Sequence, residues 1–168
     1  MKPAHALKSA LPGAMLAILA FSLTSAPAVA ATATTTFAVT ATVQATCAVT
    51  ATALGFGTYV PTAASAAAST VSVTCTNATP YNIGLDAGTF SGATVTNRSM
   101  TGPGSASLNY ALTSDSAHTI NWGNSAGSWV AGTGNGSAQP VTIYGQVAAG
   151  QYVGPGAYSD TITATVNY

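Results

Sequence analysis

The sequence predicts an all-β protein, and three observations support this prediction. Apolar and polar residues alternate with a period of two through most of the chain after residue 30. Only 4% of the 168 residues are charged, Glu is absent, and Ala, Thr, Ser and Gly dominate. Turn-rich stretches such as Thr101–Gly104 and Gly132–Gly136 separate the alternating segments. Several short strands with turns between them, in a chain of about 140 residues, indicate a β-sandwich.

The first thirty residues have the features of an export signal. Lys2 and Lys8 give a positive start, Leu11–Leu23 is apolar, and Ala28–Ala30 has the small-x-small pattern that signal peptidase cleaves. A membrane anchor is the alternative, but a helix needs about 20 apolar residues to span a bilayer, which this run does not supply. We therefore expect a signal peptide over residues 1–30 and an exported mature chain without a transmembrane segment.

The alternating segments follow one another along the chain. In residues 33–49 the odd positions are apolar except for Thr35, and the even positions are mostly Thr. The later segments with this pattern are Val71–Cys75, Tyr81–Leu85, Leu108–Leu112, Val141–Val147 and Tyr158–Tyr168. No segment after residue 30 has a helical period, and we interpret Thr62–Ala68 as a loop or a short helical turn.

Two cysteines, Cys47 and Cys75, remain in the exported chain. In an oxidising compartment an even pair is by default a disulfide, which would stabilise the fold by about 3–4 kcal/mol. A metal site would need more ligands than two Cys and the distant His118. A catalytic Cys would need a base beside it, which the sequence does not suggest. The expected bridge ties the first strand of the domain body to the second.

The two ends of the mature chain suggest pairing between copies. The N-terminal alternation is longer than the usual strand of about 5–6 residues, so Cys47 is a natural start for the body. Residues 32–45 then form an extra strand, and the last segment ends at Tyr168 without a following partner, which leaves an open sheet edge. Strand addition between subunits fits both features. The alternation equally allows residues 32–45 to fold back as an edge strand of the same domain. The apolar stripe of the extension consists of Phe37, Val39, Ala41 and Val43.

Few residues carry chemistry. One Arg in the mature chain cannot neutralise a phosphate backbone, so we expect no nucleic-acid partner. Asp115 and His118 are close in sequence, but no nucleophile motif accompanies them, and we expect no enzyme activity and no cofactor or metal. Asp86 and Asp160 lie beside turns and are expected to cap them. Arg98, the only mature cation, is expected to pair with an Asp or with the carboxy terminus. The alternative to a structural role is that Trp122 and Trp129 stack on sugars, although such residues are more often core or interface anchors.

Short blocks across the whole mature chain resemble the spore coat protein U domain family, the subunit domain of archaic (Csu-type) chaperone–usher pili. In order, they are Cys47, Leu54–Tyr59, Val71–Thr76, Tyr81–Gly88, Arg98–Met100, Leu108–Leu112, Trp122–Gly123, Gly150–Tyr152, Gly156–Thr161 and the strand that ends at Tyr168. Each block is short, and their order and spacing make the resemblance specific.

The resemblance implies an incomplete immunoglobulin-like β-sandwich that a donor strand from another subunit completes. The partners it implies are identical or related pilin subunits, a periplasmic chaperone and an outer-membrane usher. By position, Phe37, Val39, Ala41 and Val43 resemble the donor-strand residues, and Cys47–Cys75 resembles the disulfide of that domain.

We therefore expect a signal peptide over residues 1–30, a donor-strand extension over 31–45 and a pilin domain over 46–168. The expected function is that of a structural subunit of a pilus, secreted through the periplasm to the cell surface, which supports adhesion and biofilm formation. The alternative is a monomeric secreted β-sandwich that binds carbohydrate or coats a surface.

Overall fold

The computed structural model describes residues 27–168, so most of the expected signal peptide lies outside the described residues. The chain divides into a unit that ends at Thr40 and a compact unit from Ala41 to Tyr168. Residues 27–46 form no strand, and their side chains are exposed. Among residues 27–168 no helix is long and apolar enough to cross a bilayer.

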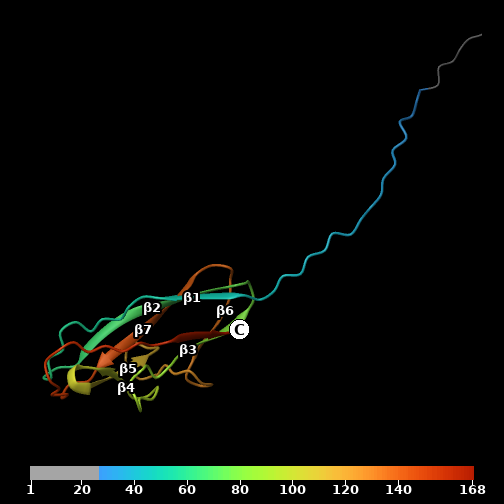
Figure 1. Ribbon diagram of the computed structural model, residues 1–168. Helices are drawn as coiled ribbons and strands as arrows, with labels where there is room; N and C mark the ends of the chain where they lie inside the picture. The colour runs from blue at the N-terminus through green and yellow to red at the C-terminus, as the bar shows by residue number, and fades with distance from the viewer. Residues whose placement is uncertain (1–26) are drawn as a thin grey trace, which may run out of the picture. The chain divides into compact units, whose positions relative to one another are not determined.

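Eight strands build the compact unit (Figure 1). They are β1 (Cys47–Ala51), β2 (Ser65–Cys75), β3 (Pro80–Leu85), β4 (Arg98–Thr101), β5 (Ser107–Thr113), β6 (Val130–Thr133), β7 (Gln139–Val147) and β8 (Ala164–Asn167). Among the described residues there is one 3₁₀ turn, Pro103–Ser105, which overlaps the turn predicted at Thr101–Gly104.

The strands form two sheets. The larger sheet has the order β1-β2-β7-β5-β4, and the smaller has the order β6-β3-β8. All pairs of neighbouring strands are antiparallel. The predicted all-β sandwich is confirmed.

The apolar core lies between the two sheets, and the alternation of the sequence accounts for it. In β2, Val71, Val73 and Cys75 are buried while the side chains between them are more exposed, because successive side chains of a strand point to opposite faces. Ile83 and Leu85 of β3 belong to the same core. The remaining buried apolar residues are Tyr81, Leu108, Tyr110, Leu112, Trp122, Ile143 and Val147.

Three sequence predictions about strands need correction. Ser65–Ala68 belongs to β2 and pairs with β7, so the interpretation of Thr62–Ala68 as a loop or helical turn was wrong for most of its length. The last strand is only four residues long, because β3 supplies ladder partners from Asn82 to Leu85 alone. β4 and β6 were not predicted, since their sequences, RSMT and VAGT, do not alternate apolar and polar residues.

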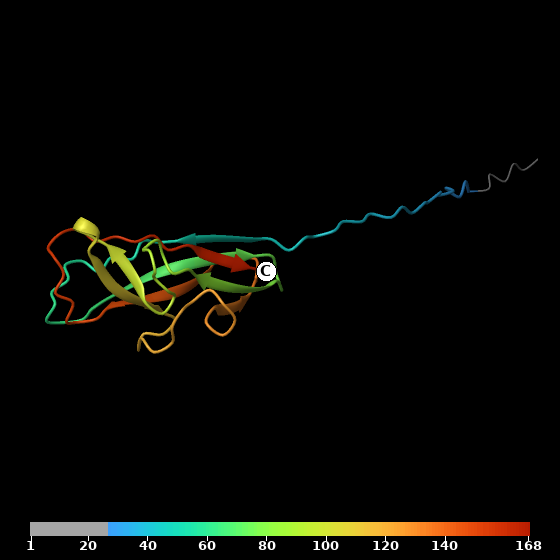
Figure 2. The same ribbon diagram turned by 60° about the horizontal axis from the view of Figure 1, so that its bottom comes forward.

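β1 and β8 belong to different sheets but lie side by side, at the side of the sandwich where each is an edge strand. They run in opposite directions, so the end of β8 and the start of β1 lie at the same end of the domain (Figure 2). Each of them has one partner strand among the described residues, β2 for β1 and β3 for β8. This side of the domain carries the candidate site.

Candidate functional site

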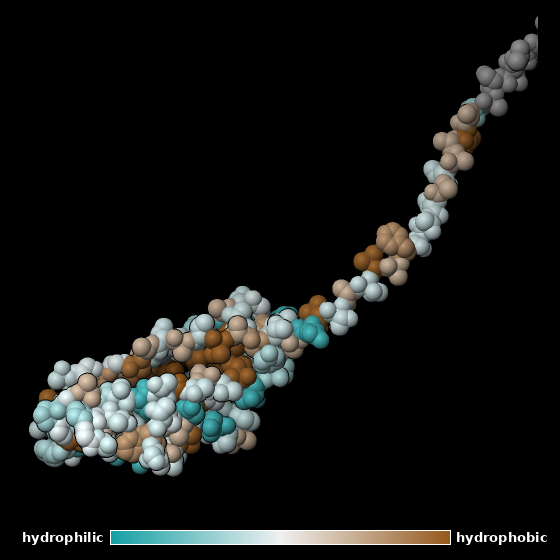
Figure 3. Space-filling model, viewed as in Figure 1, coloured by the Kyte–Doolittle hydropathy of each residue, from teal (hydrophilic) through white to brown (hydrophobic). Residues whose placement is uncertain are grey.

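A groove runs between the segment that follows β1 and the segment that precedes β8. Its two adjoining cavities measure about 410 and 720 Å³. Residues 51–59 line it on one side, residues 153–164 line it on the other, and core residues such as Leu112 and Ile143 also line it. Figure 3 shows hydrophobic surface gathered in a hollow on this face. We call this feature the edge groove.

Leu54 and Phe56 line both cavities of the edge groove, together with Met100 and Tyr158. Gly145 of β7 leaves room for Leu54 and Phe56. A Cβ atom at this position would lie 2.9 Å from Leu54 Cδ1 and 3.0 Å from Phe56 Cζ. The Phe56 ring also meets the Tyr110 ring edge to face at 6.0 Å. The segment after β1 is therefore packed onto the larger sheet by its own apolar side chains.

β8 begins at the edge groove, which its first residue, Ala164, lines, and its backbone groups continue along the open edge beyond it. The carbonyl of Thr163 accepts a hydrogen bond from Asp86 N–H at 3.1 Å, on the side of β3. Because backbone groups alternate in direction along a strand, Ala164 and Val166 direct their N–H and C=O away from β3. The same two residues turn their half-buried apolar side chains toward the core. This edge combines backbone hydrogen-bonding groups with an apolar wall, as strand addition requires.

Asp160 holds the start of the β8 segment in place. One carboxylate oxygen accepts hydrogen bonds from the backbone N–H and the hydroxyl of Thr89, both at 2.8 Å. The other oxygen accepts the hydroxyl proton of Tyr110 at 2.7 Å. Gly88, at φ +83°, gives the carboxylate room, because any Cβ there would clash with it. Asp160 was predicted to cap a turn. In the structure its side chain also joins the segment before β8 to Thr89 and to Tyr110 of β5.

The titration of this cluster follows from these contacts. Burial by itself would raise the pKa of Asp160, but hydrogen bonds from Thr89, Tyr110 and Thr161 outweigh burial and leave that pKa below its usual range. Burial and the hydrogen bond to Asp160 raise the pKa of Tyr110 well above its usual range. Asp160 therefore stays ionised and Tyr110 stays a hydrogen-bond donor across the physiological range.

Arg98 of β4 is fully buried and binds backbone rather than a carboxylate. Its guanidinium donates to the carbonyls of Leu85, Asp86, Val95 and Trp122 at 2.7–3.0 Å. Burial lowers its pKa, partly offset by the negative groups nearby. Neither expected partner, an Asp carboxylate nor the carboxy terminus, receives these hydrogen bonds; the four carbonyls take all of them. Arg98 thereby fixes the end of β3, which is the strand that β8 pairs with.

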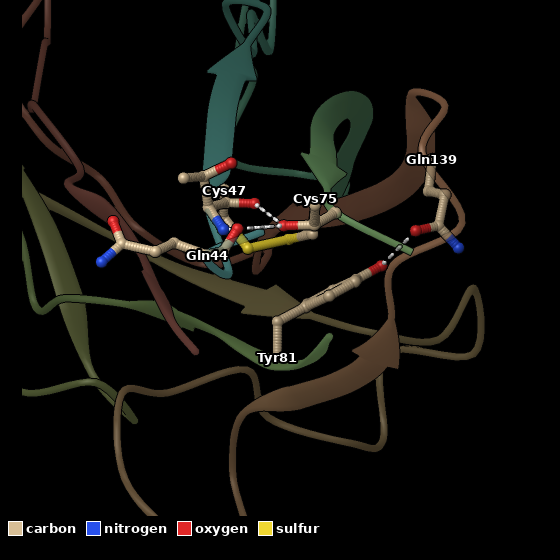
Figure 4. Close-up of a disulfide and its surroundings, with 7 residues drawn as sticks. Gln44, Cys47, Cys75, Tyr81 and Gln139 are labelled. Carbon is tan, nitrogen blue, oxygen red and sulfur yellow. Dashed lines mark hydrogen bonds between the residues drawn. A yellow bond between two sulfur atoms is a disulfide. The ribbon is translucent and has the colours of Figure 1, made fainter. Parts of the chain in front are cut away.

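The expected disulfide is present and joins β1 to β2 (Figure 4). Cys47 and Cys75 are opposite residues of the β1–β2 ladder, with Cα atoms 4.1 Å apart. Thr76 continues this pairing toward the extension: its hydroxyl accepts from Thr46 N–H at 2.7 Å, and its own N–H donates to the Thr46 carbonyl at 3.0 Å. The root of the extension is therefore attached both covalently and by hydrogen bonds.

The apolar stripe of the extension is exposed to solvent. Phe37 and Val39 are each 84% exposed, and Val43 is 81% exposed. Ala41 between them is exposed as well. Side chains of this size are usually buried in a folded protein, so a continuous exposed stripe indicates a surface that binds something.

The other candidate residues serve the fold. Asp115 accepts backbone hydrogen bonds from Thr119 and Ile120, and the bond from Ile120 is the largest cause that lowers its pKa. The ring of His118 lies 3.3 Å from the hydroxyl of Thr113, the last residue of β5. Trp122, considered for sugar stacking, is fully buried and donates its indole N–H to the Ile83 carbonyl. Within residues 27–168 no three His, Cys, Asp or Glu side chains gather in a way that could hold a metal ion.

The fold and the groove define an immunoglobulin-like sandwich of the kind found in chaperone–usher pilus subunits. A model of the Spore Coat Protein U domain matches residues 33–165, and the chain belongs to this family. Protein U of Myxococcus xanthus is 36% identical over 182 residues, which cover 98% of this chain and 99% of that protein.

Solved structures with a similar fold include a chaperone–subunit complex. It is the CsuC–CsuE chaperone–tip adhesion subunit pre-assembly complex from archaic chaperone–usher Csu pili of Acinetobacter baumannii, with a TM-score of 0.57 and 23% sequence identity. The match covers 76% of this chain and 40% of that chain.

Several groove residues were missed at the level of sequence. Leu54 and Phe56 lie in a segment without a ladder, and side-chain periodicity says nothing about such a segment. Tyr158 was expected on the apolar face of the last strand, and the structure places it before β8, in the groove. One signal was available: Gly145 interrupts an otherwise apolar strand face, and a glycine inside a strand often marks the close approach of another segment.

Proposed function

We propose that this protein is a structural subunit of a cell-surface fibre that assembles by exchange of strands between subunits. Residues 31–45 of one copy enter the edge groove of the next copy and add a strand to β8. Phe37, Val39, Ala41 and Val43 fill the groove, while the Thr side chains between them stay at the surface. We also propose the division into a signal peptide (1–30), an extension (31–45) and a pilin domain (46–168).

One pair of features carries this proposal: an exposed apolar stripe on the extension, and an apolar groove along a strand edge on the body. Phe37 and the two valines would each gain about 1.5–3 kcal/mol from burial. The backbone groups of Ala164 and Val166 would supply hydrogen bonds that do not depend on the side chains of the partner.

The open groove also supports a role for other proteins, a chaperone and an usher, in assembly. An exposed apolar groove promotes aggregation, so a subunit in transit needs a protein that covers it. The solved relative is a chaperone–subunit pre-assembly complex, which fits a periplasmic chaperone in this role. Secretion through the periplasm, an outer-membrane usher, and a role in adhesion and biofilm formation complete the proposed function.

A denaturing gel of unboiled exported protein tests the proposal. We expect the wild-type chain to give a ladder of detergent-resistant multimers, since strand-exchanged sheets unfold slowly. The double variant Phe37→Asp, Val39→Asp should give monomer, because each substitution places a charge in an apolar groove.

A matched control adds the same charges to the other face of the extension. The double variant Thr36→Asp, Thr40→Asp should keep the ladder, since these side chains would remain in solvent. A single monomer band for wild type, unchanged by either pair of substitutions, would contradict the proposal and favour a monomeric secreted protein that coats a surface or binds carbohydrate.

A further inference from the structure

The disulfide lies where the extension enters the domain body. Cys47–Cys75 is the first pair of the β1–β2 ladder, and outside it Thr76 is hydrogen-bonded to Thr46 and, through its hydroxyl at 3.5 Å, to the Gln44 carbonyl. Any pull on the extension therefore reaches these contacts before it reaches another part of the body.

Without a covalent bond, such a pull would peel β1 from β2. β1 has one partner strand among the described residues and runs antiparallel to it, so tension at its first residue loads the ladder bonds one after another. Each bond contributes only about 0.5–1.5 kcal/mol net, and bonds loaded in sequence break singly. The chain immediately after β1, Ala51–Leu54, lines the edge groove. Peeling would therefore dismantle one side of the groove.

The disulfide closes residues 47–75 into a loop with a sequence separation of 28. This loop contains β1, the groove side formed by residues 51–59, and β2. Tension that enters at Cys47 crosses the sulfur–sulfur bond to Cys75 and does not pass along the chain between them.

The path beyond Cys75 is well supported. The turn after β2 is held by hydrogen bonds from Ala78 N–H to the Gly134 carbonyl and from Gly134 N–H to the Thr79 carbonyl, both 2.8 Å. β3 follows at once, and it is hydrogen-bonded on one side to β6 and on the other to β8. The tension thus arrives in the central strand of the smaller sheet, next to the edge that the groove exposes.

We infer that Cys47–Cys75 is a tension bypass, which carries force from the extension into β3 and keeps β1 and its side of the edge groove free of load. The inference rests on the proposed function only because strand exchange is what would pull on the extension. A subunit in a stretched fibre would then keep hold of the strand in its groove while its own extension is under force.

Single-molecule pulling on the full mature chain, with handles before Ala31 and after Tyr168, tests this inference. The handle after Tyr168 loads the edge strand β8, which peels from β3 in oxidised and reduced chains alike. Beyond this shared event, the oxidised chain should show no event before the cooperative opening of the domain. The double variant Cys47→Ser, Cys75→Ser should show an additional early event at lower force, which lengthens the chain by about 20–30 Å as β1 and the first residues of the groove side come free. Its total unfolding length should also be longer by roughly 90–100 Å, because the 28-residue loop is no longer closed.

Two further measurements keep the result decisive. If the double variant fails to fold, the oxidised chain can be pulled before and after reduction by a thiol, so that the same folded molecule is compared with itself. Thr76→Val removes the hydrogen bonds of the Thr76 hydroxyl outside the loop, and the oxidised variant should still lack the early event. An early event other than that of β8, at equal force in oxidised and reduced chains, would overturn the bypass, and so would the absence of such an event in both.

A synthetic peptide of residues 31–45 separates this inference from the proposed function. Failure of the peptide to bind at zero force would contradict strand exchange, while the early event would still decide the bypass. If the peptide binds, reduction should shorten its bound lifetime under tension by tenfold or more and leave its zero-force lifetime unchanged. An equal lifetime under tension in oxidised and reduced chains would contradict the inference and leave strand exchange standing.

Discussion

Two segments of the chain, residues 33–45 and residues 158–168, carry the same sequence pattern and have opposite surroundings. In residues 33–45 and again in residues 158–168, apolar side chains alternate with Thr and other polar residues. At the C-terminal end, Ile162, Ala164 and Val166 pack against the core. At the N-terminal end, Phe37 and Val39 remain 84% exposed. Alternation therefore specifies a face that can be buried, and it does not specify which partner buries it.

The partner of the C-terminal segment is β3, and Arg98 fixes the end of that strand. The first prediction, with the largest effect, removes this support. Arg98→Ala leaves the buried carbonyls of Leu85 and Trp122 without a hydrogen bond and opens a cavity. We expect it to lower the free energy of unfolding by about 3–5 kcal/mol, measured by urea denaturation of the monomer.

Arg98→Lys sharpens this result, since it keeps the charge but cannot supply the same set of donors. It should recover only part of the lost stability. Full recovery by Lys would show that charge, and not the hydrogen bonds to four carbonyls, is what β3 requires.

Much of the fold followed from the sequence, because the strands that build the core show their faces directly. Val71–Cys75 and Tyr81–Leu85 have alternating apolar residues, and the structure places them in β2 and β3. The disulfide followed from export and an even cysteine count. β4 escaped prediction because its buried members, Arg98 and Ser99, are polar and are held by hydrogen bonds that no pattern reveals.

The edge groove was predictable only as an open edge. The alternation of the last segment suggested a strand edge on one side of the groove. Nothing in the sequence suggested which residues form the opposite side. Leu54 and Phe56 reach the groove through the close approach that Gly145 allows, and such an approach depends on tertiary structure. Likewise, the three-way role of Asp160 joins residues far apart in sequence.

The second prediction applies one substitution to each alternating segment. Val166→Asp places a carboxylate against the core and should lower the free energy of unfolding by about 2–4 kcal/mol. Val43→Asp, on the exposed stripe, should change it by less than about 0.5 kcal/mol. Urea denaturation of both monomers measures the difference, and the gel assay should show that Val43→Asp still weakens multimers. Equal loss of stability in the two variants would mean that the extension packs on its own domain.

The third prediction concerns Asp160, which positions the β8 segment, and its expected loss of stability is smaller than those of Arg98→Ala and Val166→Asp. Asp160→Asn keeps the size of the side chain but replaces one acceptor with a donor that faces the Tyr110 hydroxyl. We expect a loss of about 1 kcal/mol at pH 7, since a hydrogen bond to a charged acceptor becomes a weaker one. Asp115→Asn is the matched control, because Asp115 lies in a loop that does not line the groove.

The pH dependence of this loss identifies its cause. The folded-state pKa of Asp160 lies below its ordinary value, so its ionised form contributes stability above the unfolded pKa of about 3.9, and this contribution is lost as the pH falls through the folded pKa. The difference in unfolding free energy between wild type and Asp160→Asn should therefore be constant above about pH 5 and shrink at lower pH. The other carboxylates titrate in both proteins, so the difference isolates Asp160. A difference that stays constant down to pH 2 would show that the ionised carboxylate is not what holds the β8 segment.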